Sequence, residues 1–137
     1  MNEIIIYTDG GARGNPGPAA IGIVIGAPVN KNYSEQIGKT TNNVAEYKAV
    51  IFALKKAKSL LGGSKAIETK IEIRSDSELL VNQLNGKYKI KDEDLQPLFI
   101  KVWNLKQDFL RVQFVHVPRE KNKEADRLVN QALDTLI

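Results

Sequence analysis

Short apolar runs alternate with amphipathic stretches along this chain, and their periods predict both strands and helices. Residues 4–8 form a β-branched run that Asp9-Gly10-Gly11 stops, and residues 20–25 form a second apolar run, which predicts two buried strands. Residues 33–39 follow a turn and are expected to pair antiparallel with residues 20–25. Glycine and proline fill residues 10–18, so we interpret that stretch as a loop.

The remaining residues predict helices that alternate with strands. The first helix has an apolar face with helical spacing, made of Tyr47, Val50, Ile51, Leu54, Ala57 and Leu61. Residues 41–43 can cap this helix, and Gly62-Gly63 can end it. Further elements are predicted as a strand over 67–75, a short helix capped by Ser75 or Asp76 that runs through Leu84, a helix over 92–106, a strand over 112–116 and a helix over 120–136 whose inward side chains are Ala125, Leu128, Val129, Ala132 and Leu136.

The order of these elements is β-β-β-α-β-α-α-β-α, which indicates an α/β fold. We expect a five-stranded mixed sheet flanked by helices, in which the first three strands are antiparallel and the last two are parallel additions. Residues 1–137 are long enough for one domain with a substantial core, to which Phe99 and Trp103 are expected to contribute.

Composition narrows the class of protein. No apolar run approaches the roughly 20 residues that cross a bilayer, so no membrane partner is expected. The chain has no cysteine, which excludes disulfides and thiolate metal sites and favours a cytoplasmic protein. Its net charge of +4 suits a polyanionic ligand, although a lysine-rich surface also keeps proteins soluble.

Four acidic residues stand where predicted elements begin or end: Asp9, Glu46, Asp76 and Asp126. Asp9 and Asp76 follow the first and fourth strands, so they emerge at one sheet edge if those strands are parallel neighbours. Four carboxylates brought together would repel one another unless cations lay between them, which predicts a site for two Mg²⁺ or Mn²⁺ ions. Taken singly, each acid also has a structural explanation as a turn residue, a helix cap or a solvated helix charge.

The residues that flank these acids resemble type 1 ribonuclease H. The matching motifs follow in the family's order and are Tyr7-Thr8-Asp9-Gly10-Gly11 with Gly14-Asn15-Pro16-Gly17, Thr40-Thr41-Asn42-Asn43-Val44-Ala45-Glu46, Ser75-Asp76-Ser77, and Asn122-Lys123-Glu124-Ala125-Asp126-Arg127-Leu128. The resemblance covers essentially the whole chain and implies a ribonuclease H-like fold. It also implies an endoribonuclease that uses Mg²⁺ or Mn²⁺ to cut the RNA strand of an RNA–DNA hybrid, leaving 5′-phosphates.

The same resemblance implies roles for individual residues. The four acids match the family's metal ligands. Asn15, Asn42 and Asn43 match positions that contact the minor groove of the hybrid, and Thr41 with Asn42 matches a pocket for a DNA phosphate. We expect the hybrid to be the partner of a monomeric enzyme that needs no other protein.

The chain departs from the family pattern at several positions. Many bacterial members carry a histidine in the loop before the last acid, whereas here that loop contains Arg119, and His116 falls in a strand pattern. We interpret Arg119 as a cation for the phosphate or the departing oxygen. Glu78 replaces a frequent glutamine, so it is either a groove contact or a fifth acid near the metals. Residues 87–91 are either a small phosphate patch or a solvated loop.

Two alternatives remain open at the level of sequence. One is a nuclease of the same fold that prefers double-stranded RNA or DNA. The other is a nucleic-acid-binding module without turnover, against which the complete set of four acids argues.

Overall fold

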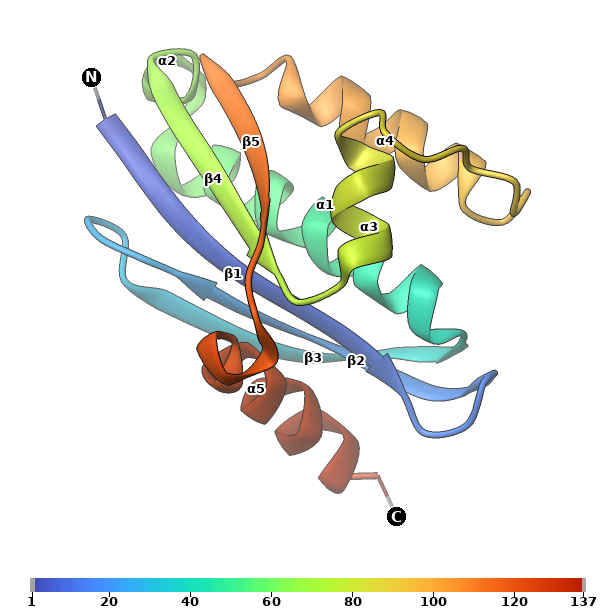
Figure 1. Cartoon of the computed structure of the whole chain (residues 1–137). Coiled ribbons are helices and arrows are strands. Elements are labelled where there is room, and N and C mark those ends of the chain that lie inside the picture. The colour runs from blue at the N-terminus through green and yellow to red at the C-terminus, as the bar shows by residue number, and fades with distance from the viewer. Residues whose placement is uncertain (1, 137) are drawn as a thin grey trace.

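Five strands form one mixed sheet, and helices cover both of its faces in the computed structural model, which describes residues 2–136 (Figure 1). The strands are β1 (Asn2–Ala12), β2 (Gly17–Ile25), β3 (Lys31–Thr40), β4 (Thr69–Ser75) and β5 (Arg111–His116). The helices are α1 (Asn42–Leu61), α2 (Gly63–Ala66), α3 (Glu78–Leu84), α4 (Gln96–Lys106), the 3-10 helix η1 (Arg119–Lys121) and α5 (Lys123–Asp134).

The strand order in the sheet is β3-β2-β1-β4-β5. β1 pairs antiparallel with β2, which pairs antiparallel with β3. β1 also pairs in parallel with β4, which pairs in parallel with β5. The predicted mixed sheet is therefore confirmed, and β1 is its central strand.

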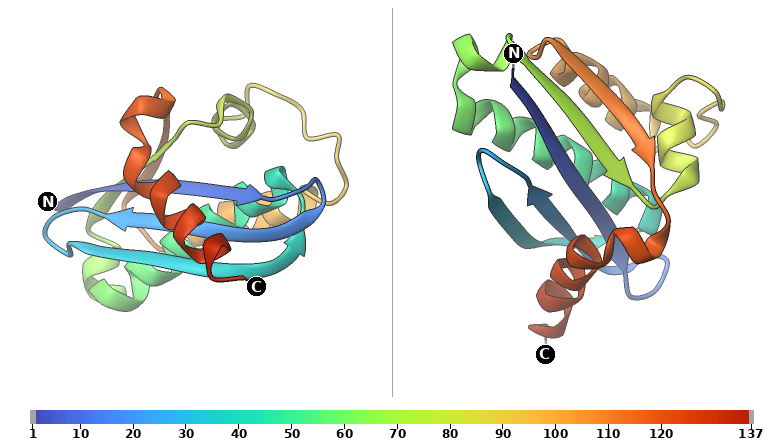
Figure 2. Two further views of the ribbon diagram at one scale, coloured as in Figure 1. Left: turned by 90° about the horizontal axis from the view of Figure 1, so that it is seen from below. Right: turned by 60° about the vertical axis from the view of Figure 1, so that its left-hand side comes forward.

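Two helices cover opposite faces of the sheet at β1 and β2 (Figure 2). α1 covers the face that carries Ile4, Ile6 and Ile23, and these side chains lie in the main core with the buried stripe of α1. α5 crosses β1, β2 and β3 on the other face, where Ala20 and Val129 belong to a smaller apolar cluster. The two core regions thus hold α1 and α5 on either side of the central strand.

The prediction of a loop over residues 10–18 is wrong at both ends. β1 continues through Gly10, Gly11 and Ala12, and β2 already begins at Gly17. Gly10 is a ladder residue, and it must be glycine because a Cβ there would overlap the carbonyl group of Ala45 in α1. Glycine marks a close approach between strand and helix here, and not a turn.

The fourth strand and its flanking helices also differ from the prediction. Ile67 lies outside β4 and is 52% exposed, because α2 follows α1 directly after Gly62. Ser77 caps α3 in place of Ser75 or Asp76, and its Oγ accepts the N–H of Leu80 at 3.2 Å.

The last two helices start later than predicted. α4 begins at Gln96, because residues 92–95 form a turn in which Asp92 Oδ1 accepts the N–H of Asp94. Residues 119–121 form η1, and α5 ends at Asp134.

Two of the apolar side chains predicted to be buried, Trp103 and Leu136, are exposed in the structure. Trp103 is 52% exposed, whereas Phe99 is partly buried against the main core. Leu136 is 43% exposed beyond the end of α5, and Leu133 occupies the inward position.

None of the helices within residues 2–136 is long and apolar enough to cross a membrane. The single domain over residues 1–137 stays a prediction, and residues 1 and 137 lie outside the described range.

Candidate active site

Asp9 and Asp76 lie side by side where two parallel strands separate. The ladder between β1 and β4 ends at the pair Tyr7 and Arg74, so each acid stands two residues beyond that pair. β1 does not end there, because Asp9 pairs with Gly22 of β2 on its other side. The two carboxylates therefore belong to one edge of the parallel part of the sheet, although Asp9 is inside a strand.

Two glycines allow the helices that carry the other acids to come close. A Cβ on Gly10 would overlap Ala45 and would lie 2.6 Å from the backbone nitrogen of Glu46. A Cβ on Gly22, the partner of Asp9 in the ladder, would overlap the carbonyl oxygen of Ala125. The first turns of α1 and α5 can therefore press on the sheet beside Asp9.

The four acids line one open cavity of about 330 Å³. Glu46 enters it from the first turns of α1, and Asp126 enters it from the first turn of α5, where its N–H donates to the carbonyl of Asn122 at 3.1 Å. Arg119 from η1 lines the same cavity. Residues from four separate parts of the chain thus share one space.

The cavity is strongly anionic, and this shows in the pKa values of its acids. Burial, followed by the charges of Asp76, Glu46 and Asp126, raises the pKa of Asp9 to about 8, against an opposing hydrogen bond from the Gly10 backbone. Burial also raises the pKa of Glu46 to about 7, while the Ser77 hydroxyl and the charge of Arg119 lower it. Ionising all four acids is costly without nearby cations.

The donor chemistry of this cavity fits a hard divalent cation. All four candidate ligands are carboxylates, which Mg²⁺ and Mn²⁺ prefer. Oε2 of Glu46 is buried and has no hydrogen-bond partner among residues 2–136, so it is an acceptor that a cation could satisfy. Over the same range, no three acidic, histidine or cysteine side chains converge tightly enough to hold an ion as they stand.

Arg119 and His116 lie at different positions relative to the acidic cavity. Arg119 lines the cavity, and its charge acts on the pKa of Glu46. His116 is the last residue of β5, pairs with Ser75 and is exposed outside the cavity lining. The arginine is therefore the better placed of the two beside the acids.

Asn15 and Asn42 connect the loop after β1 to the start of α1. Oδ1 of Asn42 accepts the N–H of Ala12 at 2.7 Å, and Oδ1 of Asn15 accepts the N–H of Asn42 at 3.1 Å. These bonds use only the acceptor of each amide, so both NH₂ groups stay available as donors.

The other residues predicted to contact nucleic acid lie around this point. Thr41 caps α1, and its Oγ1 accepts the N–H of Val44 at 3.3 Å. Asn43 is exposed in the first turn of α1. Glu78 is the first residue of α3, is exposed and does not line the cavity, so the structure does not bring it into the acid cluster.

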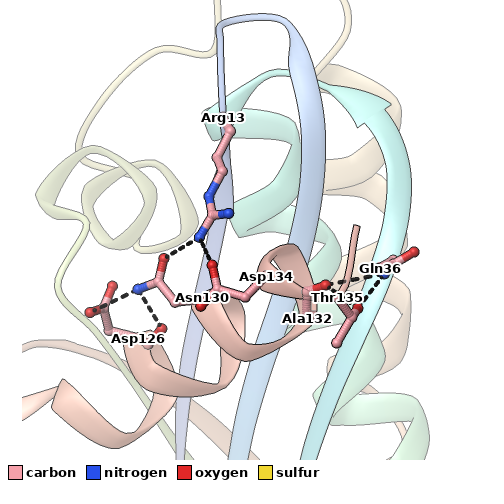
Figure 3. Close-up of polar contacts among 7 residues, drawn as sticks. All are labelled: Arg13, Gln36, Asp126, Asn130, Ala132, Asp134 and Thr135. Atoms are coloured by element: carbon pink, nitrogen blue, oxygen red, sulfur yellow. Dashed lines mark hydrogen bonds and ion pairs between the residues drawn. The ribbon is translucent and has the colours of Figure 1, made fainter. Parts of the chain in front are cut away.

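Two residues beside the acids were not predicted from the sequence, Arg13 and Asn130 (Figure 3). Asn130 Nδ2 donates to the backbone oxygen of Asp126 at 3.2 Å and to its Oδ2 at 3.5 Å. Arg13 donates to Asn130 Oδ1 at 3.5 Å and pairs with Asp134 at 2.5 Å. Asn130 follows Asp126 by one helical turn, a spacing that could have indicated the contact. Nothing local could have placed Arg13 against α5.

Comparisons with known proteins agree with this arrangement. Residues 7–132 match a family model described as reverse transcriptase-like. A bifunctional protein of Mycobacterium tuberculosis is 40% identical over 96% of this chain and 36% of its own length. A ribonuclease HI of Halobacterium salinarum is 41% identical over 93% of this chain and 63% of its own length. The chain thus spans only about a third of the mycobacterial relative.

Solved structures match the chain along nearly their whole length. An RNase H1 isolated from compost by a metagenomic approach is 51% identical, with 98% of this chain and 97% of the other covered and a TM-score of 0.89. The structure of that RNase H1 in complex with an RNA/DNA hybrid matches with 50% identity, 96% coverage of both chains and a TM-score of 0.88.

Proposed function

The chain belongs to the type 1 ribonuclease H family, and on this premise we propose that it is a metal-dependent endoribonuclease that hydrolyses the RNA strand of RNA–DNA hybrids. The observation that carries the proposal is the meeting of Asp9, Glu46, Asp76 and Asp126 in one cavity. The complex of the compost RNase H1 with an RNA/DNA hybrid supports the choice of substrate.

We propose the four carboxylates as ligands of two Mg²⁺ or Mn²⁺ ions. When bound, such ions supply an activated water and charge stabilisation for the departing oxygen of a phosphodiester. Water adds to phosphorus, the bond from phosphorus to the 3′ oxygen breaks, and the products carry a 5′-phosphate and a 3′-hydroxyl. We propose Asp9 as the central ligand of this set, a choice supported by the effect of the other three acids' charges on its pKa.

Arg119 supplies a fixed positive charge at the edge of the acid cluster. A guanidinium offers hydrogen-bond donors and no acceptor, so its role is electrostatic: it stabilises negative charge on the phosphate or on the leaving oxygen. It does not transfer a proton.

The asparagines beside the cavity are proposed to hold the hybrid. The unused NH₂ donors of Asn15 and Asn42 suit base-edge and 2′-hydroxyl acceptors, which an A-form-like duplex displays across a shallow minor groove. Thr41 and Asn42 begin α1, whose N-terminal end favours a phosphate, and Asn43 is exposed next to them. Glu78, outside the cavity, is proposed as a groove contact and not as a fifth ligand. The monomeric state and the cytoplasmic location rest on sequence alone and stay predictions.

A panel of labelled duplexes tests this function. RNA–DNA hybrid, double-stranded RNA and double-stranded DNA of one sequence are incubated with the protein in Mg²⁺, Mn²⁺ or EDTA, beside the Asp9→Asn variant. We expect only the RNA strand of the hybrid to be cut, only with metal and only by the wild type, with 5′-phosphate ends. Cleavage restricted to another duplex would refute the substrate, and binding without any cleavage would identify a non-catalytic module.

A further inference from the structure

One buried side chain, Asn122, attaches the start of α5 to the central strand. Asn122 is 1% exposed, and its Nδ2 donates to the carbonyl oxygen of Thr8 at 3.0 Å across 114 positions of sequence. Thr8 directly precedes Asp9, and Asn122 directly precedes α5, which carries Asp126. A single hydrogen bond therefore connects the backbones that present two of the acids.

The carbonyl of Thr8 needs a partner that the sheet does not provide at this point. The parallel ladder between β1 and β4 ends at Tyr7, one residue earlier, and Thr8 is itself 1% exposed. A buried backbone carbonyl is costly without a donor. The amide of Asn122 supplies the donor where β4 has turned away.

The backbone of Asn122 is bonded to two further residues of the site. Its N–H donates to the carbonyl of Arg119 at 2.9 Å, and its carbonyl accepts the N–H of Asp126 at 3.1 Å. Asn122 is thus within one hydrogen bond of Arg119, of Asp126 and of the residue before Asp9. Other side-chain bonds to α5 lie further along, among them those of Ser34 Oγ to the carbonyl of Leu128 and of Gln36 to the carbonyl of Ala132.

The side-chain amide of Asn122 is only half satisfied. Its Oδ1 is buried and has no hydrogen-bond partner within the described part of the chain. An unsatisfied buried acceptor is destabilising, and an apolar side chain of similar volume would remove that penalty but would leave the buried carbonyl of Thr8 without its donor. One unsatisfied buried group would replace the other, so we expect the benefit of the asparagine in the geometry of the site.

We propose that Asn122 is a positioning residue that fixes the spacing of Asp9, Arg119 and Asp126 and so sets the affinity of the acid cluster for divalent ions. This inference rests on the proposed function. Partners that orient metal ligands typically change metal affinity or activity by about 10- to 100-fold when they are removed.

The test compares Asn122→Leu with Ser34→Ala, a control that also removes one side-chain hydrogen bond to α5 but leaves its N-terminal end attached. Hybrid cleavage is measured against Mg²⁺ and against hybrid concentration, at a temperature where circular dichroism shows each variant folded. For Asn122→Leu we expect the Mg²⁺ concentration for half-maximal activity to rise about 10-fold, and kcat to fall about 10-fold. KM for the hybrid and all values for Ser34→Ala should stay near the wild type.

A second readout does not need activity. Mn²⁺ is titrated into the substrate-free proteins by calorimetry, and Asn122→Leu should bind it about 10-fold more weakly than Ser34→Ala does. If wild type binds Mn²⁺ but does not cut the hybrid, the proposed function fails while this comparison still decides the positioning role. Asn122→Ser, which keeps a donor on a shorter side chain, replaces the leucine variant if that one is unfolded. Equal Mn²⁺ affinities, or equal losses in the Asn122 and Ser34 variants, would overturn the proposal.

Discussion

Replacing Asp9 by asparagine should stabilise the metal-free protein while it abolishes hydrolysis. Asp9 is ionised in the unfolded chain above its ordinary pKa of 3.8, whereas in the folded protein its pKa is raised to about 8. Between these values the folded state binds more protons than the unfolded state, so the free energy of unfolding falls as pH rises from about 4 to 8. Above pH 8 the whole penalty for an ionised Asp9 is present, and asparagine removes it.

The size of the effect follows from the two pKa values. Their difference of about four corresponds to a ceiling of about 5 kcal/mol. Part of the pKa shift of Asp9 comes from the charges of Glu46, Asp76 and Asp126, whose side chains can turn toward water, so we expect about 2 kcal/mol to be measured. For a chain of this length that raises the midpoint of thermal unfolding by about 6–8 °C.

Thermal unfolding in EDTA at pH 5, 7 and 9 measures this difference. Asp94→Asn is the matched control, because it makes the same chemical change at an exposed carboxylate in the turn before α4. The gain from Asp9→Asn should grow from pH 5 to pH 9 and exceed that of the control, and added Mg²⁺ should stabilise the wild type more than the variant. A variant no more stable than wild type at pH 9 would refute the account of the anionic cavity.

Three further changes probe separate parts of the proposed enzyme. Gly22→Ala should cost about 1–3 kcal/mol in unfolding experiments and reduce hybrid cleavage, because the new Cβ overlaps the backbone of α5; unchanged stability would contradict the close approach. Arg119→Ala should lower kcat about 100-fold while the Mg²⁺ dependence stays near normal, and unchanged turnover would remove Arg119 from the site. Replacing Lys87, Lys89 and Lys91 with alanine should flatten the salt dependence of hybrid affinity by a slope of up to about 3. An unaltered slope would identify residues 87–91 as a solvated loop.

The sheet and the meeting of the acids could be predicted because both depend on short-range patterns. A β-branched run that ends in a polar residue predicts a strand end, and parallel neighbours place such ends together. Asp9 and Asp76 meet because the ladder between β1 and β4 ends two residues before each of them, although β1 itself continues along β2. Asp76 does not serve as the cap of α3, because Ser77 does.

The glycines after Asp9 were misread because their reason is not local. In sequence, Gly10 and Gly11 are typical of a turn. In the structure Gly10 is a ladder residue that faces Ala45, and Gly11 faces Val129 of α5. The helices that require these small residues lie far away along the chain, so a local pattern could not distinguish close packing from a loop.

The errors at the last helices have a similar cause. α4 packs against α1 and buries Val102, so Trp103 on its outer surface remains exposed. In α5 the inward face continues from Val129 to Leu133, four residues on, and the helix ends before Leu136. An apolar residue is buried only if its helix continues to that position and another part of the protein covers that side of the helix.

Several features around the acids oppose folding stability, and they lie in one place. Two buried side-chain atoms lack a hydrogen-bond partner within residues 2–136, Oε2 of Glu46 and Oδ1 of Asn122. One belongs to an acid of the cluster, and the other to the residue that connects Asp9 with Asp126 through the backbone. Asp9 adds the penalty of a buried charge among three like charges. Proteins carry such unfavourable features where function requires them, so their clustering around one cavity is an argument for the active site that does not depend on the resemblance of its motifs.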